Sequence, residues 1–121
     1  MGKTVLIVDD SSSLRQVVSM ALKGGGYEVI EACDGKDALT MLAGQKIHLV
    51  ISDVNMPNMD GITFVKEMKK NPAYKFVPVI MLTTEGSEEK KKAGQEAGAK
   101  AWVVKPFQPA QMLAAVSKLL M

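Results

Sequence analysis

Three aspartates follow short apolar runs that are rich in β-branched residues. Asp9 and Asp10 come directly after Val5–Val8, and Asp53 comes just after Ile47–Ile51. The chain has six aspartates, so half of them occupy this one kind of position. If the two runs are parallel strands of an open sheet, their carboxyl ends share one edge and the three side chains converge there. The sequence therefore predicts an acidic site at that edge.

Three carboxylates at one edge repel one another, and the repulsion raises the pKa of one or more of them unless a cation binds. The set offers oxygen ligands without histidine or cysteine, which favours Mg²⁺ or Mn²⁺ over zinc. Bound Mg²⁺ keeps several waters, whose positions a phosphoryl group can take. The alternative is that these aspartates only cap the following helices. Ser12 or Ser13 is better placed as that cap, with Gln16 completing a capping box from Ser13.

Two further apolar runs end in residues that suit a phosphoryl group. Thr83 and Thr84 follow Val77–Leu82, and Lys105 follows Ala101–Val104. A lysine ammonium is a compact charge that pairs with a phosphate oxygen, and a threonine hydroxyl can donate to another. Each of these residues taken singly is usually a solvated loop residue. At the same edge as three carboxylates, they predict a site for phosphoryl chemistry.

Short apolar runs alternate with stretches of helical spacing along the chain. The runs are Val5–Val8, Tyr27–Ile30, Ile47–Ile51, Val77–Leu82 and Ala101–Val104. The clearest helical stripes are Leu14, Val17, Val18, Ala21 and Leu22, and Met112, Leu113, Val116, Leu119 and Leu120. Near-continuous runs are typical of strands buried on both faces of a parallel sheet. The order predicts an α/β fold of flavodoxin-like type, a doubly wound parallel sheet of five strands in the order 2-1-3-4-5 with five helices.

Three other features have plainer interpretations. Gly24–Gly26 follows a helix rather than a strand, so we predict a helix cap and turn and not a phosphate-binding loop. His48 lies in an apolar run and is predicted to be packed rather than to accept a phosphoryl group. The segment Ser87–Ala97 offers only Ala93 and Ala97 to a core, which predicts a loosely held helix.

The composition bounds the class of protein. With 121 residues, 47% hydrophobic and 23% charged, the chain predicts one globular domain over residues 1–121 and excludes a disordered or collagen-like protein. The net charge of +2 is too weak a bias to indicate nucleic-acid binding. Cys33 is the single cysteine, which precludes an internal disulfide or a cysteine metal site. Without an apolar run near ~18 residues or a signal peptide, we expect a cytoplasmic protein.

Four stretches resemble the response-regulator receiver domain of two-component signalling, and in particular the single-domain chemotaxis regulators of the CheY type. They are Val8–Ser11, Asp53–Gly61, Leu82–Thr84 and Val104–Phe107. The resemblance covers essentially the whole chain, and the stretch DVNMPNMDG is highly specific in combination with the acid pair and the Lys-Pro. The CheY type has the sheet order 2-1-3-4-5, so this topology and the resemblance are not independent expectations.

The resemblance implies a role for each residue of the acidic site. Asp53 is the implied nucleophile, which accepts a phosphoryl group from a phosphohistidine of a histidine kinase. Asp10 and Asp53 are implied to bind Mg²⁺ through their side chains. Asn55 is implied to do so through its backbone carbonyl, and Asp9 largely through water. Such a site positions and neutralises phosphoryl oxygens, as transfer through a loose in-line transition state requires.

The other motif residues are implied to read and to time the phosphorylated state. Thr83 and Lys105 would contact the acyl phosphate. Asn55 and Glu85 occupy the positions that tune its hydrolysis, and this pair is similar to that of fast-resetting chemotaxis regulators. Trp102 departs from the family, which has Tyr, Phe or His three residues before the lysine as a ring that changes rotamer with the threonine. The implied signal is short-lived.

The resemblance implies a phosphoacceptor protein that resets by autodephosphorylation, rather than an enzyme, with no output domain of its own. The implied partners are a histidine kinase and a downstream protein such as a flagellar motor switch protein. We expect a monomer that binds neither nucleic acid nor a membrane. In the family, the helix expected in Ser87–Ala97 forms the usual output face with the last strand and last helix.

Other functions stay open beside this one. Within the same class, the chain could serve as a phosphate sink or a phosphorelay intermediate. The rival from another class is a small phosphatase with an aspartyl-phosphate intermediate. Such enzymes typically carry a second aspartate two positions after the nucleophile on the first strand, whereas Asp9 and Asp10 are adjacent here. A flavin-binding module would need a phosphate-cradling loop where these carboxylates stand.

Overall fold

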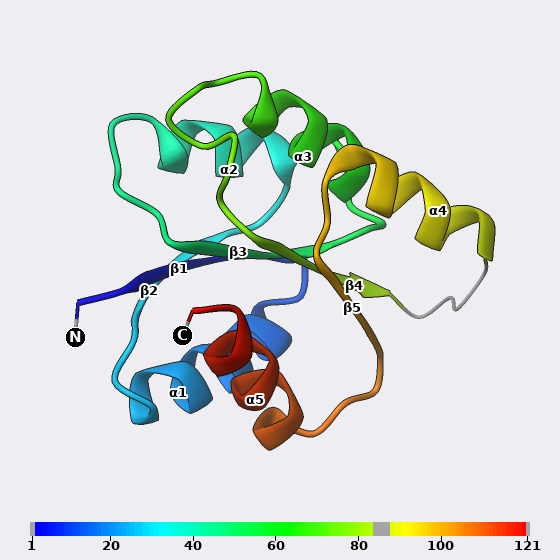
Figure 1. Ribbon diagram of the computed structural model, residues 1–121. Coiled ribbons are helices and arrows are strands. Elements are labelled where there is room, and N and C mark those ends of the chain that lie inside the picture. The colour runs from blue at the N-terminus through cyan, green and yellow to red at the C-terminus, as the bar shows by residue number, and fades with distance from the viewer. Residues whose placement is uncertain (1, 84–87, 121) are drawn as a thin grey trace.

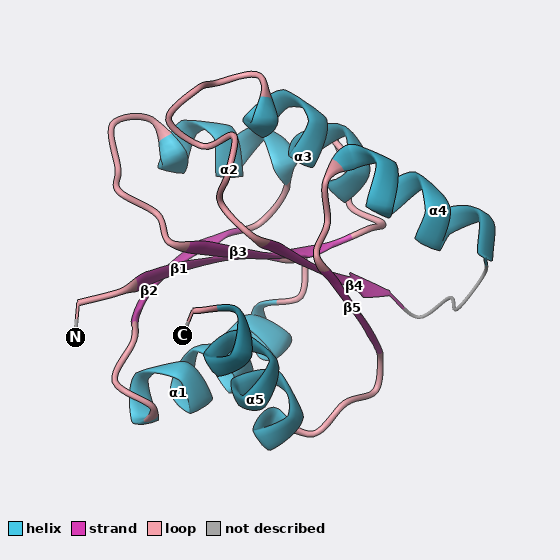
Figure 2. Cartoon of the chain, viewed as in Figure 1, coloured by secondary structure: helices cyan, strands magenta, loops and turns pink. Residues whose placement is uncertain are grey.

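Figures 1 and 2 show the computed structural model, which describes residues 2–83 and 88–120. Within these residues, five strands alternate with five helices. The strands are β1 (Thr4–Val8), β2 (Glu28–Ala32), β3 (Leu49–Asp53), β4 (Val79–Thr83) and β5 (Ala101–Val104). The helices are α1 (Ser12–Gly24), α2 (Gly35–Leu42), α3 (Gly61–Lys69), α4 (Glu88–Ala97) and α5 (Pro109–Leu119). The strands pair in parallel in the order β2-β1-β3-β4-β5, which confirms the predicted fold.

The strand register aligns the polar residues that follow the strands. Val8 of β1 lies opposite Ser52 of β3, one residue before Asp9 and Asp53. The last residue of β4, Thr83, lies opposite the last residue of β5. The residues that sequence analysis places after these four strands therefore meet at one edge of the sheet, here called the carboxyl edge.

Helices cover both faces of the sheet, with α2, α3 and α4 on one face and α1 and α5 on the other (Figure 1). Side chains of each strand alternate between two cores, as the pleat requires. Leu6 and Val8 of β1 pack toward the first group of helices, and Val5 and Ile7 pack toward the second. Phe64 anchors α3 and is wholly buried, which stabilises the fold by roughly 2–3 kcal/mol.

The start of α1 is fixed by Ser11. Its Oγ accepts a hydrogen bond from the Leu14 N–H at 3.2 Å, which makes it the N-cap. The prediction that Ser12 or Ser13 caps this helix was therefore wrong. The reason is that Asp9 Oδ1 accepts the Ser11 N–H at 2.8 Å, and this bond turns the chain into the helix directly after β1.

Two elements predicted from local sequence are confirmed, the helix cap and turn at Gly24–Gly26 and a helix within Ser87–Ala97. Gly24–Gly26 forms the end of α1 and a turn, and Gly26 has a φ of +92°, which favours glycine. Helix α4 contacts the core through the buried Ala97. His48 is half-buried just before β3, where its Nδ1 accepts the Thr4 N–H at 2.9 Å.

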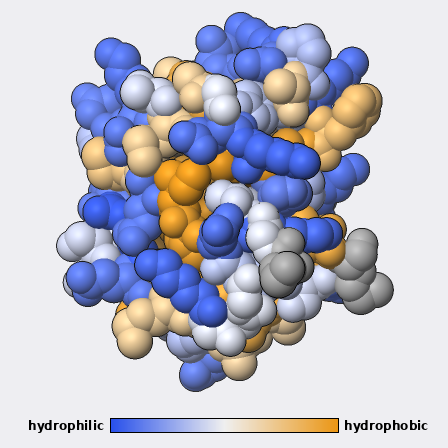
Figure 3. Space-filling view, turned by 90° about the vertical axis from the view of Figure 1, so that its left-hand side faces the viewer, coloured by the Kyte–Doolittle hydropathy of each residue, from blue (hydrophilic) through white to orange (hydrophobic). Residues whose placement is uncertain are grey.

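The amino-terminal ends of the strands form the face shown in Figure 3, where a hydrophobic area lies amid hydrophilic residues. A groove of about 500 Å³ along the outer strand β2 includes Tyr27, Val29 and Ile30 in its lining.

Among the helices that the structure describes, none is long and apolar enough to cross a membrane.

Candidate functional site

The structure brings the three predicted aspartates together at the carboxyl edge. One carboxylate oxygen from each of Asp9, Asp10 and Asp53 lies within 4.8 Å of the others. Asp9 is wholly buried and Asp53 is 6% exposed, whereas Asp10 is exposed. Two buried carboxylates at this separation have lost most of their hydration, so the site gains from any cation placed between them.

Lys105 supplies one such cation from the end of β5. Its Nζ lies 3.0 Å from Asp9 Oδ2 and 3.3 Å from Asp53 Oδ2. Burial together with the charge of Asp9 raises the pKa of the Asp53 carboxyl, although Lys105 opposes this shift. Burial also disfavours the Lys105 ammonium, but its bonds to the two carboxylates outweigh this and raise the pKa of Lys105. One ammonium thus only partly balances two buried carboxylates.

The backbone around Asp53 leaves this residue little freedom. Its Oδ1 accepts the Val54 N–H at 2.8 Å, and its carbonyl accepts the Ser52 hydroxyl at 2.9 Å. Gly61, the first residue of α3, packs so closely that a Cβ there would lie 1.9 Å from the Asp53 carbonyl oxygen. Glycine at this position is therefore a packing requirement of the site.

Sequence reasoning missed the residue that holds the chain at Asp9. Arg15, on the first turns of α1, donates through Nη1 to the Asp9 carbonyl oxygen and pairs with Glu31 of β2 at 3.2 Å. The signal available in the sequence was a basic residue six positions after Asp9. An exposed salt bridge is an equally good explanation of such a residue, so the sequence could not distinguish the two.

The remaining predicted residues differ from one another in how deeply they are buried and in the contacts they make. Thr83 is wholly buried at the end of β4, and its carbonyl accepts the Lys105 N–H at 2.7 Å. Asn55 is exposed, two residues after Asp53. Trp102 is half-buried against the core cluster that includes Ala97 of α4, and its Nε1 has no hydrogen-bond partner among the described residues. Glu85 lies outside the residues that the structure describes.

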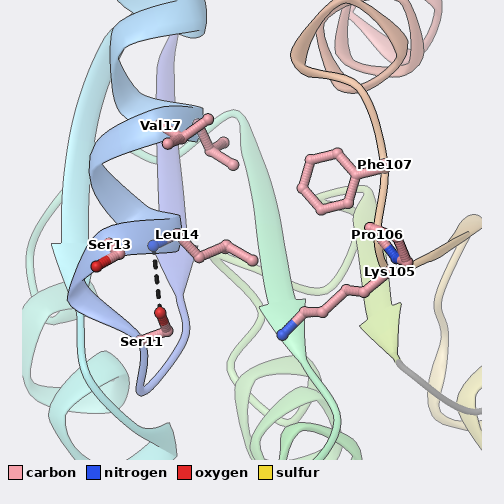
Figure 4. A pocket seen from close by; sticks show the side chains of 8 residues that line it. Ser11, Ser13, Leu14, Val17, Lys105, Pro106 and Phe107 are labelled. Carbon is pink, nitrogen blue, oxygen red and sulfur yellow. Dashed lines mark hydrogen bonds between the residues drawn. The ribbon is translucent and has the colours of Figure 1, made fainter.

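A groove of about 530 Å³ lies beside the acidic cluster, between α1 and the loop that joins β5 to α5 (Figure 4). Leu14 and Val17 line it from α1, and Phe107 faces them from the loop (Figure 4). Lys105 and Ser11 belong to the same lining, so the groove runs into the charged site. This apolar surface was not predicted from the sequence.

Some relatives with similar sequences are transcriptional regulators that are longer than this chain. The phosphate regulon transcriptional regulatory protein PhoB of Pseudomonas aeruginosa is 35% identical over 120 residues, which cover 99% of this chain and 52% of that protein. The chain spans about half the length of the curated relatives it matches.

Solved structures with the same fold cover the chain almost completely. The chemotaxis protein CheY4 of Vibrio cholerae superposes with a TM-score of 0.95 at 48% identity, over 99% of this chain and 100% of that chain. A CheY-like receiver domain protein from Methanospirillum hungatei gives a TM-score of 0.92 at 28% identity, over 99% of this chain and 94% of that chain. The fold is thus the CheY-like flavodoxin fold.

The sequence profile of the response regulator receiver domain matches residues 5–117. Apart from Thr4, the first residue of β1, this span includes the five described strands and the whole acidic cluster. Receiver domains generally bind Mg²⁺ at an acidic pocket, and the cluster at the carboxyl edge is a pocket of that kind. The chain therefore belongs to the family of response regulator receiver domains.

Proposed function

We propose that this chain is a phosphoacceptor response regulator in which Asp53 accepts a phosphoryl group from a phosphohistidine of a histidine kinase. An Asp53 carboxylate oxygen forms the new P–O bond while the P–N bond to the donor imidazole breaks. The observation that carries the proposal is the placement of Asp53 beside two more aspartates and Lys105 at one sheet edge. Transfer of this kind needs positioning and charge neutralisation more than covalent help.

The donor set fits Mg²⁺, and Mn²⁺ takes the same donors. Three carboxylates within 4.8 Å offer only oxygen, and burial leaves the Asp53 charge incompletely balanced. We assign the side chains of Asp10 and Asp53, and the carbonyl of Asn55, to the metal, with Asp9 acting through water. When bound, the cation neutralises charge on the attacking and transferred oxygens.

Lys105 and Thr83 are proposed to contact the phosphoryl group once it is attached. The Lys105 ammonium already lies between the two buried carboxylates, so it needs only a small shift to pair with a phosphoryl oxygen. Hydrolysis of the acyl phosphate then resets the protein, at a rate that Asn55 and Glu85 tune. Trp102 is proposed to sense the change from its place against the core beside Ala97 of α4.

The phosphoryl group is proposed to shift an existing equilibrium between two states that bind partners differently. The groove between α1 and the β5–α5 loop offers the kinase an apolar surface beside Asp53. The downstream partner would bind at α4, β5 and α5, where Val104 is 44% exposed.

The high identity to CheY4, a chemotaxis protein, supports a chemotaxis output such as binding to a flagellar motor switch protein. Identity to PhoB, a transcriptional regulatory protein, supports a second candidate, a receiver that acts in transcriptional regulation. A role as phosphate sink or relay intermediate predicts rapid loss of the phosphoryl group without a downstream target.

The test has two readouts, Trp102 fluorescence and phosphate incorporation, for the wild type, Asp53→Asn and Asp37→Asn. Fluorescence is followed during a Mg²⁺ titration, and both readouts are followed after acetyl phosphate is added. Asp37 lies on α2 outside the cluster and serves as the matched control. We expect phosphate incorporation in the wild type and in Asp37→Asn, and none in Asp53→Asn. Equal incorporation in Asp53→Asn would move the site elsewhere. Sustained hydrolysis of p-nitrophenyl phosphate would favour the phosphatase instead.

A further inference from the structure

The turn between β2 and α2 is joined to the loop between β3 and α3 by one buried carboxylate. Asp34 is 7% exposed and is the N-cap of α2, where its Oδ1 accepts the Asp37 N–H at 2.8 Å. Its second oxygen, Oδ2, accepts a hydrogen bond from Asn58 Nδ2 at 2.8 Å. The first bond caps a helix, and the second reaches across to the loop that follows Asp53.

The loop meets this turn in a conformation that few residues could take. Asn58 has a φ of +66°, in the left-handed region where asparagine is among the better-tolerated side chains. The next carbonyl, of Met59, accepts the Gly35 N–H at 3.3 Å. A Cβ on Gly35 would lie 2.8 Å from Met59 Cγ and 2.9 Å from its carbonyl oxygen, so the two backbones are in direct contact.

The loop is thus held at both ends and once between them. It leaves β3 at Asp53 and enters α3 at Gly61, whose N–H donates to the Val54 carbonyl at 2.8 Å. Between these points, Asn55 lies three residues before Asn58. Hydrogen bonds from the Asp37 backbone and from Asn58 hold the pKa of Asp34 below its ordinary value, so both acceptor oxygens are available at neutral pH.

We propose that Asp34 and Asn58 are positioning residues for the metal site, because their hydrogen bond fixes the loop that presents the Asn55 carbonyl. This inference rests on the proposed function, which assigns that carbonyl to the cation. Residues that orient metal ligands from behind typically change metal affinity about 10- to 100-fold when they are replaced. Neither residue is a member of the acidic cluster itself.

Two substitutions separate this role from helix capping. Asp34→Ser keeps a good N-cap but shortens the side chain so that it no longer reaches Asn58. Asn58→Gly keeps the left-handed backbone but removes the amide. Asn71→Gly is the matched control, because Asn71 Oδ1 accepts the Ala73 N–H at 2.9 Å in a loop before β4, far from the carboxyl edge.

The experiment measures Mn²⁺ affinity from the EPR signal of the free ion, and the thermal midpoint of unfolding, for the wild type, both variants, their double variant and the control. We expect each single variant to bind Mn²⁺ about tenfold more weakly, and the double variant to be no weaker than either. The control should keep the wild-type affinity.

Affinities within twofold of the wild type, with only the midpoint lowered, would overturn the inference and leave a purely structural cap. A double variant weakened about a hundredfold would also overturn it, because the two residues would then act separately. If the wild type itself binds no Mn²⁺, the proposed function fails first, and the two failures are thereby distinguished.

Discussion

The two edges of the sheet are built on different principles. At the carboxyl edge, the Lys105 ammonium lies within 3.3 Å of two buried carboxylates, and the charges do not cancel. At the opposite edge, the polar groups are paired by hydrogen bonds. Thr4 and His48 exchange two hydrogen bonds of 2.9 Å, and the Tyr74 hydroxyl donates to the Leu42 and Gln45 carbonyls.

This difference separates stability from chemistry. Satisfied hydrogen bonds hold strands in register and leave no polar group in need of a further partner. Charges that are buried but incompletely balanced cost stability, and they give a cation or a phosphoryl group something to bind. The comparison implies that substitutions at the opposite edge change unfolding alone, whereas those at the carboxyl edge change unfolding and ligand binding together.

The largest effect is expected from Gly61→Ala. The new methyl group would overlap the Asp53 carbonyl oxygen, so the backbone of β3 or α3 must move, at a cost of about 3 kcal/mol in unfolding free energy. Mg²⁺ affinity should fall as well, because Asp53 moves with its backbone. Urea denaturation and Mg²⁺ titration measure the two effects. Gly24→Ala is the control, since a Cβ there meets nothing within 4 Å.

Lys105→Met is the next test, and it should lower the free energy of unfolding while raising the affinity for Mg²⁺. Without Mg²⁺ the variant should lose about 2 kcal/mol of stability, because Asp9 and Asp53 lose their cation at a site that is only partly exposed. Mg²⁺ should bind roughly fivefold more tightly, since a neighbouring positive charge is gone. Lys118→Met, on the exposed face of α5, should do neither. Weaker Mg²⁺ binding in Lys105→Met would contradict this account of the charges.

Tyr74→Phe probes the opposite edge. Removing the hydroxyl takes a donor from the Gln45 carbonyl beside a buried ring, whereas the Leu42 carbonyl still accepts the Gln45 N–H at 2.8 Å, and we expect a loss of about 1 kcal/mol in unfolding free energy. Mg²⁺ affinity and phosphate incorporation should stay at wild-type values, and a change in either would break the comparison. Tyr27→Phe is the matched control, because its hydroxyl bonds Ser117 at an exposed position and should cost little.

The smallest effect is a pH dependence that comes from Asp53. Because burial and Asp9 raise its pKa in the folded protein above the ordinary 3.8, the folded state binds the proton more tightly than the unfolded state. Stability should therefore fall as pH rises from about 3.8 through the raised pKa, and level off above it. Denaturation of the wild type and Asp53→Asn across this pH range isolates the contribution of Asp53 to the free energy of unfolding. If the wild type instead gains stability relative to Asp53→Asn as pH rises, the pKa of Asp53 is not raised in the folded protein.

The fold and the composition of the site could be predicted because both follow from strand ends. Parallel neighbouring strands of similar length end at the same edge of the sheet. Once the sheet order is known, Asp9, Asp53, Thr83 and Lys105 are therefore expected at that edge. The predicted cap of α1 was wrong because three consecutive serines could fill that position. The choice of Ser11 depends on the bond from its N–H to the Asp9 carboxylate, which the sequence does not reveal.

Contacts between separate loops were beyond the sequence. The bond from Asn58 to Asp34 spans 24 residues and depends on a left-handed backbone at Asn58. Several residues can satisfy either end, so neither position stands out by type or spacing. The groove beside Leu14 was missed for a similar reason, because its walls come from opposite ends of the chain and nothing in the local pattern of Leu14 or Phe107 indicates that they face each other.

The start of β1 and the end of α5 lie on the same side of the molecule, away from the acidic site (Figure 1). Lys3 Nζ donates to the Leu120 carbonyl oxygen at 2.8 Å, which ties the two ends together. For protein engineering, we therefore expect that both linkers of an inserted copy of this domain can leave from the same side of it. It can be inserted into a surface loop of a carrier protein, or carry a fluorescent label at either end, while the carboxyl edge and the face of α4, β5 and α5 stay open to solvent.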